Sequence, residues 1–285
     1  MGPTVADALA DRATQENFPV ALRLLPARYR RHLMAVYGYA RTVDDIGDKA
    51  PEPDRLPLLA ALEADLSRLY ARLGGDASAA APTSPAVREL EPTVSAFGIP
   101  MQPFIDLIRA NQQDQVVSRY QTFEDLVGYC RLSANPVGRI VLYIFASYTQ
   151  QRAELSDAVC TALQLAEHWQ DVAEDYQAGR IYLPLEDLES YGCAANDLAA
   201  ASVSTQVRAL MAFEVGRARD LMATGAPLIG TLRGFARAAV AGYVAGGRAA
   251  LAAIEAADYD VLRVTPAPQR SRTAAELGKA YVRGR

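Results

Sequence analysis

The chain has 285 residues, of which 51% are hydrophobic, 22% charged and 8% aromatic. This composition is typical of a globular protein and excludes the disordered, collagen-like and coiled-coil classes. The 29 basic residues against 33 acidic ones give a net charge of −4, so no overall positive field would attract nucleic acid and we expect no nucleic-acid partner.

The cysteines and the chain start bear on the cellular compartment. Cys130, Cys160 and Cys193 are odd in number and widely spaced, which fits neither a disulfide framework nor a CxxC metal site, so we expect reduced thiols. The start of the chain has charged residues instead of the basic and apolar regions of a secretion signal. The longest charge-free stretch, residues 92–105, is too short to span a membrane. We therefore expect a cytoplasmic protein.

Apolar residues recur at helical spacing between prolines and glycines, and strict alternation is almost absent, so an all-α fold is predicted. The first helix is expected from Pro26 to about Asp48, ahead of Pro51 and Pro53. Further helices are predicted at about 54–73, 85–97, 101–117, 122–133, 136–151, 156–178, 203–224 and 229–257.

The connections between these helices predict one domain over residues 1–285. The segment 74–85, rich in Ala, Ser and Pro, is the one predicted loop of low complexity and is too short to separate domains. The basic tail at 266–285 is expected to be a solvated terminus, with a weak attraction to anionic lipid as the alternative.

Two acidic clusters carry the functional prediction. In the first, Asp44 and Asp48 are four residues apart and share one helix face with Arg41 and Tyr37. The second repeats the spacing, and its members are Gln164, Glu167, Asp171 and Asp175. Like charges at this spacing repel by about 0.2–0.5 kcal/mol per pair. A bound cation would offset that repulsion.

Mg²⁺ is the cation that this donor set predicts. It takes oxygen ligands, keeps several waters, and bridges carboxylates to substrate phosphates. Arg41 and the later Arg180 could then hold phosphate oxygens directly. A single DxxxD pattern is more often a solvated helix face, but both copies lie among apolar and aromatic residues, where charges seldom stay unpaired. No GxGxxG or GxxxxGK[ST] motif indicates a nucleotide site.

Several segments together resemble the squalene/phytoene synthase family of isoprenoid synthases, over about residues 15–265. They are 17–20 (NFPV), 25–26 (LP), 37–41 (YGYAR), 44–48 (DDIGD), 171–175 (DVAED) and 180–184 (RIYLP). Within that family, residues 16–20 (ENFPV), 133–139 (SANPVGR) and 168–172 (HWQDV) are most similar to the hydroxysqualene synthases of bacterial hopanoid pathways.

The resemblance implies an all-α isoprenoid-synthase bundle around a central cavity, with Mg²⁺ bound by two facing acidic helices. The metal ligands would be Asp44, Asp48, Glu167, Asp171 and Asp175, with Glu167 at a position where relatives commonly have Asn. Together with Arg41, the four aspartates would form the catalytic set. The substrate-binding residues implied are Phe18 at the entry, Tyr37, Gln164 and Arg180.

The implied reaction is the conversion of presqualene diphosphate to hydroxysqualene with release of diphosphate, and it needs no NADPH because water ends it. The alternatives are head-to-head condensation of two farnesyl or geranylgeranyl diphosphates and, more distantly, a non-catalytic assembly factor. The expected partners are the isoprenoid diphosphate itself and the pathway enzymes that supply presqualene diphosphate and accept hydroxysqualene, with peripheral membrane contact as an open alternative.

Overall fold

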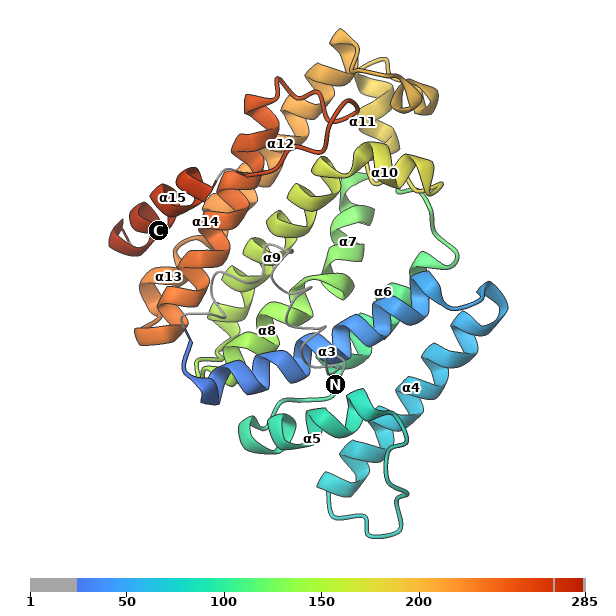
Figure 1. Ribbon diagram of the computed structural model, residues 1–285, viewed down its shortest axis with the longest axis vertical. Helices are drawn as coiled ribbons and strands as arrows, with labels where there is room; N and C mark the ends of the chain where they lie inside the picture. Colours follow the sequence, from blue (N-terminus) through green and yellow to red (C-terminus); the bar gives the residue numbers. More distant parts are fainter. Residues whose placement is uncertain (1–24, 269, 284–285) are drawn as a thin grey trace, which may run out of the picture. The chain divides into compact units, whose positions relative to one another are not determined.

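The computed structural model describes residues 25–268 and 270–283 (Figure 1). The chain divides into two compact units. Unit 1 extends to Val116 and includes Pro136–Thr149, and unit 2 consists of Val117–Asn135 and Gln150 onward. The predicted all-α fold is confirmed, since the described residues form helices and a single isolated bridge, between Arg119 and Ile181. The single domain and the central cavity stay predictions.

Unit 1 is built around its first helix. Its helices are α3 (Ala27–Lys49), α4 (Glu52–Leu73), α5 (Pro85–Phe97), α6 (Gln102–Asp114) and α8 (Asn135–Ile144), the last of which begins in unit 2. Helix α3 packs against α4, α5 and α6. Tyr39 and Val43 on its inner face are fully buried, and the Tyr39 hydroxyl donates to the carbonyl of Phe104, 3.0 Å away. Helix α3 is thereby held in place by buried apolar side chains and by the hydrogen bond from Tyr39 to α6.

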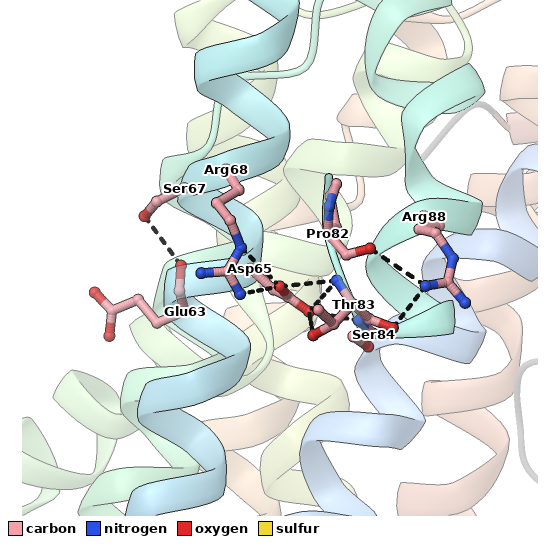
Figure 2. A network of polar contacts seen from close by, with 8 residues as sticks. All are labelled: Glu63, Asp65, Ser67, Arg68, Pro82, Thr83, Ser84 and Arg88. Carbon is pink, nitrogen blue, oxygen red and sulfur yellow. Dashed lines mark hydrogen bonds and ion pairs between the residues drawn. The ribbon is translucent and has the colours of Figure 1, made fainter. Parts of the chain in front are cut away.

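A buried carboxylate in unit 1 joins α4 to the start of α5 (Figure 2). Asp65 is 2% exposed and accepts hydrogen bonds from the Thr83 backbone and hydroxyl at 3.0 and 2.9 Å, and from the Ser84 backbone at 2.5 Å. Arg68 pairs with the same carboxylate. Ser84 is the N-cap of α5 and its own side chain makes no cap bond. Asp65 therefore satisfies backbone donors at the entry to α5 from a different helix.

Unit 2 packs its longest helices side by side. It contains α7 (Phe123–Ser133), α9 (Gln150–Gln170), α10 (Val172–Gln177), α11 (Leu185–Ser190), the 3₁₀ helix η1 (Ala195–Ala199), α12 (Thr205–Gly225), α13 (Leu228–Thr231), α14 (Gly234–Ala256) and α15 (Arg270–Arg283). Helix α9 contacts both α12 and α14. Trp169 on α9 is fully buried, and its ring N–H donates to the carbonyl of Glu214 at 3.2 Å.

Two acidic side chains are buried where α11 meets α12. Arg217 lies 2.5 Å from the carboxylate of Asp187 and 3.3 Å from the carboxyl group of Glu214. Its guanidinium also covers the rings of Phe123 and Phe213, at 3.8 and 4.7 Å from their centroids. Burial raises the pKa of Glu214 to about 8, against the effect of Arg217, and a hydrogen bond with Asp187 adds to the rise. Glu214 is therefore largely protonated at neutral pH.

The predicted helix at 136–151 is wrong in its extent. Helix α8 ends at Ile144 because Ala146 adopts a left-handed conformation with φ 50°. The backbone N–H of Ser147 donates to Leu142 and that of Ala146 to Tyr143, both at 2.8 Å, which is the Schellman pattern of helix termination. Helix α9 then starts at Gln150, earlier than the predicted start at residue 156. An alanine gives no signal for this stop.

The predicted helix over 156–178 is interrupted at Asp171, which has φ −101° and ψ 14° and separates α9 from α10. The backbone bond from Asp175 N–H to Asp171 carbonyl, 2.8 Å, is still made. The expectation of a solvated basic tail at 266–285 is also wrong. Residues 270–283 form α15, which packs against α14 and buries Ala280. Within the described ranges, none of the helices combines the length and apolarity that a membrane crossing requires.

Candidate active site

The first acidic cluster lies on the last turns of α3 in unit 1. Tyr37, Arg41, Asp44 and Asp48 follow one another at spacings of four, three and four residues, so they share one side of the helix. Tyr37, Arg41 and Asp44 are half-buried and Asp48 is exposed. The helix begins after Pro26 and ends at Lys49, just before Pro51. Because a proline disfavours helical conformation in the residue before it, Pro51 ends the helix directly after the acidic cluster.

Asp44 is the most perturbed carboxylate of this cluster. Burial raises its pKa to about 6. Asn111 on α6 acts in the opposite direction by donating from Nδ2 to Asp44 Oδ1 at 3.1 Å. The neighbouring carboxylates of Asp48 and Asp45 raise the pKa further, while Arg41 lowers it. The negative charge on Asp44 is therefore incompletely compensated, and a cation at this carboxylate would be favoured.

Arg41 is turned toward Asp45. Its Nε lies 3.1 Å from Asp45 Oδ1, and Lys49 reaches the same oxygen at 2.6 Å. Asp45 thus forms ion pairs with both Arg41 and Lys49. Neither of these two ion pairs involves the aspartates of the DxxxD motif. Partly exposed ion pairs of this kind contribute little to stability, about 0–1 kcal/mol.

The second acidic cluster lies at the junction of α9 and α10 in unit 2. Asp171 is the N-cap of α10, and its backbone N–H still donates to the Glu167 carbonyl at 3.0 Å. Asp171 and Asp175 therefore keep their one-turn spacing despite the break. Burial, and secondarily Glu174, raises the pKa of Asp171. Glu167 is exposed.

A buried histidine adjoins Asp175. His168 stacks on the ring of Tyr182, with centroids 3.7 Å apart and planes within 13°. Its Nε2 lies 3.2 Å from Gln164 Nε2, and its Nδ1 lies 3.9 Å from Asp175 Oδ2. Burial, with a contribution from Arg180, lowers the pKa of His168 to about 3. The ring is therefore neutral, and a tautomer with its proton on Nδ1 accepts from Gln164 and directs the N–H toward Asp175.

The segment carrying Arg180 is held by backbone hydrogen bonds. The N–H of Arg180 donates to the Asp175 carbonyl at 2.8 Å, and that of Ile181 donates to Ser118 at 2.9 Å. Tyr182 then packs among Tyr120 and Tyr129, with centroids 5.9 Å from each. These contacts fix Arg180 close to the second acidic cluster.

The structure thus brings the predicted residues together in two groups, one in each unit. Unit 1 gathers Tyr37, Arg41, Asp44 and Asp48, and unit 2 gathers Gln164, Glu167, Asp171, Asp175 and Arg180. Phe18 lies outside the described residues. Among residues 25–268 and 270–283, no group of three or more His, Cys, Asp or Glu side chains forms a metal site. The predicted Mg²⁺ ligands therefore stay a prediction, although their carboxylate oxygens match the preference of that ion.

Sequence reasoning missed two residues that contact the clusters. Asn111 is 67 positions from Asp44 and lies in a polar run at the end of a predicted helix, which gives no sign of its partner. His168 is adjacent to Glu167 in the sequence, and its spacing seven residues before Asp175 places both on one helix face. That spacing is a signal that could have identified it.

The family model and the individual relatives that match this chain indicate the same protein family. Residues 11–274 match the family model described as squalene/phytoene synthase. The hydroxysqualene synthase of Zymomonas mobilis is 35% identical over 68% of this chain and 63% of its own length, so the match covers less than two thirds of that relative. The hydroxysqualene synthase of Rhodopseudomonas palustris is 32% identical over 77% of this chain and 72% of its own length.

Solved structures agree with the sequence matches. The squalene synthase HpnC from Alicyclobacillus acidocaldarius is 39% identical, with a TM-score of 0.78 over 91% of this chain and 97% of that one. A dehydrosqualene synthase at 24% identity has a TM-score of 0.83 over 98% and 97% of the two chains, and shows the same fold. With its all-α structure and two acidic clusters, the chain belongs to the squalene/phytoene synthase family of enzymes.

Proposed function

We propose that this enzyme converts presqualene diphosphate to hydroxysqualene and diphosphate in a Mg²⁺-dependent reaction of squalene and hopanoid biosynthesis. The observation that carries the proposal is the presence of two intact DxxxD motifs in a chain 35% and 32% identical to two hydroxysqualene synthases. A non-catalytic assembly factor would not need to retain these four carboxylates.

In this proposal each acidic cluster serves to hold Mg²⁺ and, through it, diphosphate. Asp44, Asp48, Asp171 and Asp175 bind Mg²⁺, with Glu167 as a further carboxylate ligand. When bound, the metal neutralises negative charge on the diphosphate as it leaves. The incomplete charge compensation at Asp44 and the raised pKa of Asp171 support this role.

Two arginines and a tyrosine complete the proposed diphosphate site. Arg41 exchanges Asp45 for a diphosphate oxygen and Tyr37 donates from the same helix face, while Arg180 binds from the second cluster. Gln164 is held by its contact with His168, 3.2 Å away. His168 is neutral and lies 3.9 Å from Asp175, so it adds no competing positive charge beside that carboxylate.

The reaction balances as a hydrolysis with rearrangement. The bond between carbon and the diphosphate oxygen breaks and both electrons leave with diphosphate, which produces a cyclopropylcarbinyl cation. The ring opens, the oxygen of one water adds to the carbon skeleton, and a proton goes to solvent. No reductant is consumed, and we therefore expect no NADPH requirement. In such chemistry, preorganised cationic groups that stabilise the leaving anion are expected to contribute most of the rate enhancement.

Head-to-head condensation of two allylic diphosphates is the alternative, and one observation favours it. The 15-cis-phytoene synthase of a Synechocystis strain is 33% identical over 72% of this chain. That reaction would use the same acidic clusters but would start from two molecules of farnesyl or geranylgeranyl diphosphate.

The deciding experiment offers the substrates one at a time. The purified protein is incubated with Mg²⁺ and either presqualene diphosphate, farnesyl diphosphate or geranylgeranyl diphosphate, and the extracted products are identified by mass spectrometry. Hydroxysqualene from presqualene diphosphate, with no product from the other two, is the expected result. A C30 or C40 product from farnesyl or geranylgeranyl diphosphate alone would assign the condensing reaction instead.

Matched variants test the two motifs. Asp48→Asn and Asp171→Asn each remove one carboxylate charge while keeping side-chain size, and turnover should fall at least a hundredfold with the circular dichroism spectrum unchanged. Asp220→Asn makes the same replacement on the exposed surface of α12 and should keep full turnover. Full turnover in Asp48→Asn or Asp171→Asn would remove that motif from the mechanism.

The proposed substrate and product also define the expected partners. An enzyme that forms presqualene diphosphate must act before this one, and an enzyme that accepts hydroxysqualene must act after it. Because both compounds are long-chain isoprenoids, peripheral contact of a cytoplasmic enzyme with a membrane belongs to the proposal, and co-flotation with vesicles containing anionic lipid would test it.

A further inference from the structure

Helices α3 and α6 approach closely at a glycine next to the first acidic cluster. Gly47 is buried, and a Cβ atom on it would lie 2.2 Å from Oδ1 of Asn111. The absence of a side chain at position 47 therefore allows the Asn111 amide to approach α3 closely. Any larger residue at position 47 would displace that amide.

In this position the Asn111 amide reaches Asp44. Its Nδ2 donates to Asp44 Oδ1 at 3.1 Å and lies 3.4 Å from the carbonyl of Leu107 on its own helix. An asparagine amide supplies this hydrogen bond without a positive charge. It can therefore orient the carboxylate while leaving its negative charge for a metal ion.

Gln115, the C-cap residue of α6, also fixes the end of α3. Gln115 Nε2 donates to the carbonyl of Gly47 at 3.2 Å and to that of Asn111 at 2.9 Å. Arg55 on α4 donates to the carbonyls of Asp48 and Ala50 at 3.0 and 2.9 Å. It also donates to Gln115 Oε1 at 3.2 Å. The carbonyl groups of Gly47, Asp48 and Ala50, which follow the last hydrogen bonds within α3, are thus satisfied. The Arg55 guanidinium also lies at the C-terminal end of α3, where the helix dipole favours a positive charge.

We propose that Asn111 is a positioning residue for the enzyme, which holds the Asp44 carboxylate in the orientation that binds the metal ion through which the diphosphate is held. The inference rests on the proposed function, since it assigns Asp44 to metal binding. Hydrogen-bond partners of metal ligands typically contribute 10–100-fold to metal affinity or activity. Without Asn111, Asp44 would populate several rotamers, and its ordering would oppose binding.

The test compares Asn111→Leu with wild type. Leucine has the same number and branching of side-chain heavy atoms as asparagine but donates no hydrogen bond. Binding of Mn²⁺ in the presence of inorganic diphosphate is followed by electron paramagnetic resonance, and turnover is titrated with Mg²⁺. We expect Mn²⁺ binding at least tenfold weaker and a similarly increased Mg²⁺ concentration for half-maximal turnover, with kcat at saturating Mg²⁺ reduced much less.

The matched control is Gln102→Leu on the same helix. Gln102 donates to Asp106 at 2.7 Å in an exposed amide-to-carboxylate contact away from α3. This variant should keep wild-type Mn²⁺ binding and Mg²⁺ dependence. Unchanged Mn²⁺ affinity in Asn111→Leu would refute the positioning role, as would an equal loss in the control.

A second pair of variants disturbs the same contact from α3. Gly47→Ala should displace the Asn111 amide and weaken Mn²⁺ binding about tenfold, and adding Asn111→Ala should cause little further loss because the contact is already broken. Independent, additive losses would contradict the inference even if Asn111→Leu fails to fold. The wild type separates the two proposals: if it does not bind Mn²⁺ with diphosphate, the proposed metal site itself fails.

Discussion

The contacts of the buried Asp65 carboxylate predict how much this side chain contributes to the free energy of unfolding. Burial by itself would raise the pKa of Asp65, but hydrogen bonds from the Thr83 and Ser84 backbone outweigh it. Together with Arg68 they lower the pKa from 3.8 to about 2. Because one pKa unit corresponds to about 1.4 kcal/mol, these contacts favour the charged form by about 2 kcal/mol.

Asp65→Asn places an amide where the backbone N–H groups need an acceptor. We expect the free energy of unfolding to fall by about 2–3 kcal/mol and the melting temperature by about 3–5 °C. Urea unfolding at pH 6 measures the first quantity. Hydrogen exchange of the amides of Thr83 and Ser84 should also accelerate, since one of the two acceptor oxygens at position 65 is replaced by an NH₂ donor.

The pH dependence of the same variant supplies an independent check. A carboxyl group whose pKa is lowered by folding stabilises the protein fully above its unfolded pKa of 3.8, and this stabilisation is lost as the pH falls through about 2. The difference between wild type and Asp65→Asn should therefore shrink between about pH 4 and pH 2. Asp76→Asn, which alters an exposed carboxylate in the segment between α4 and α5 that also carries Thr83, should change stability little. A difference that stays constant over this pH range would refute the reasoning.

Two further predictions concern unit 2. Glu214, whose pKa is raised to about 8, stabilises the fold fully below its unfolded pKa of 4.5, and this is lost as the pH rises through about 8. As the pH rises from 4.5 to about 8, the free energy of unfolding of the wild type should therefore fall relative to that of Glu214→Gln, by several kcal/mol in order of magnitude. Urea unfolding of both proteins across this pH range measures the difference, and a constant difference would contradict the prediction. Gly225→Ala should destabilise by about 1–3 kcal/mol, because its Cβ would lie 2.6 Å from the Leu155 carbonyl oxygen. Gly216→Ala on the same helix meets nothing within 4 Å and should stabilise by up to about 1 kcal/mol in thermal unfolding.

Local sequence patterns predicted most of the helices and their approximate limits. The prolines near both ends of α3 and the apolar positions along it were sufficient to place that helix at Ala27–Lys49. The prediction failed where a helix ends at a residue that has no strong preference for a helix-ending conformation. Ala146 adopts a left-handed conformation directly after the buried end of α8, and alanine has no intrinsic preference for that conformation.

Helix α15 shows the opposite error. Among its described side chains Ala280 is the one that is buried, and the segment is rich in arginine, so its sequence resembles a solvated tail. The helix is nevertheless held by α14, and Arg237 donates to the carbonyl of Tyr281 at 2.6 Å. Tertiary contacts supply what the local pattern lacks, because short amphipathic helices are stabilised mainly by packing.

The sequence by itself determined the helical class, the two DxxxD motifs and the family, because these depend on residue type and on spacing along one helix. Tertiary structure alone decided that Asn111 contacts Asp44 and that Gly47 makes room for it. It also decided that Arg41 pairs with Asp45. Such contacts arise from how helices pack and which rotamers their side chains adopt, and one sequence carries no local signal for either.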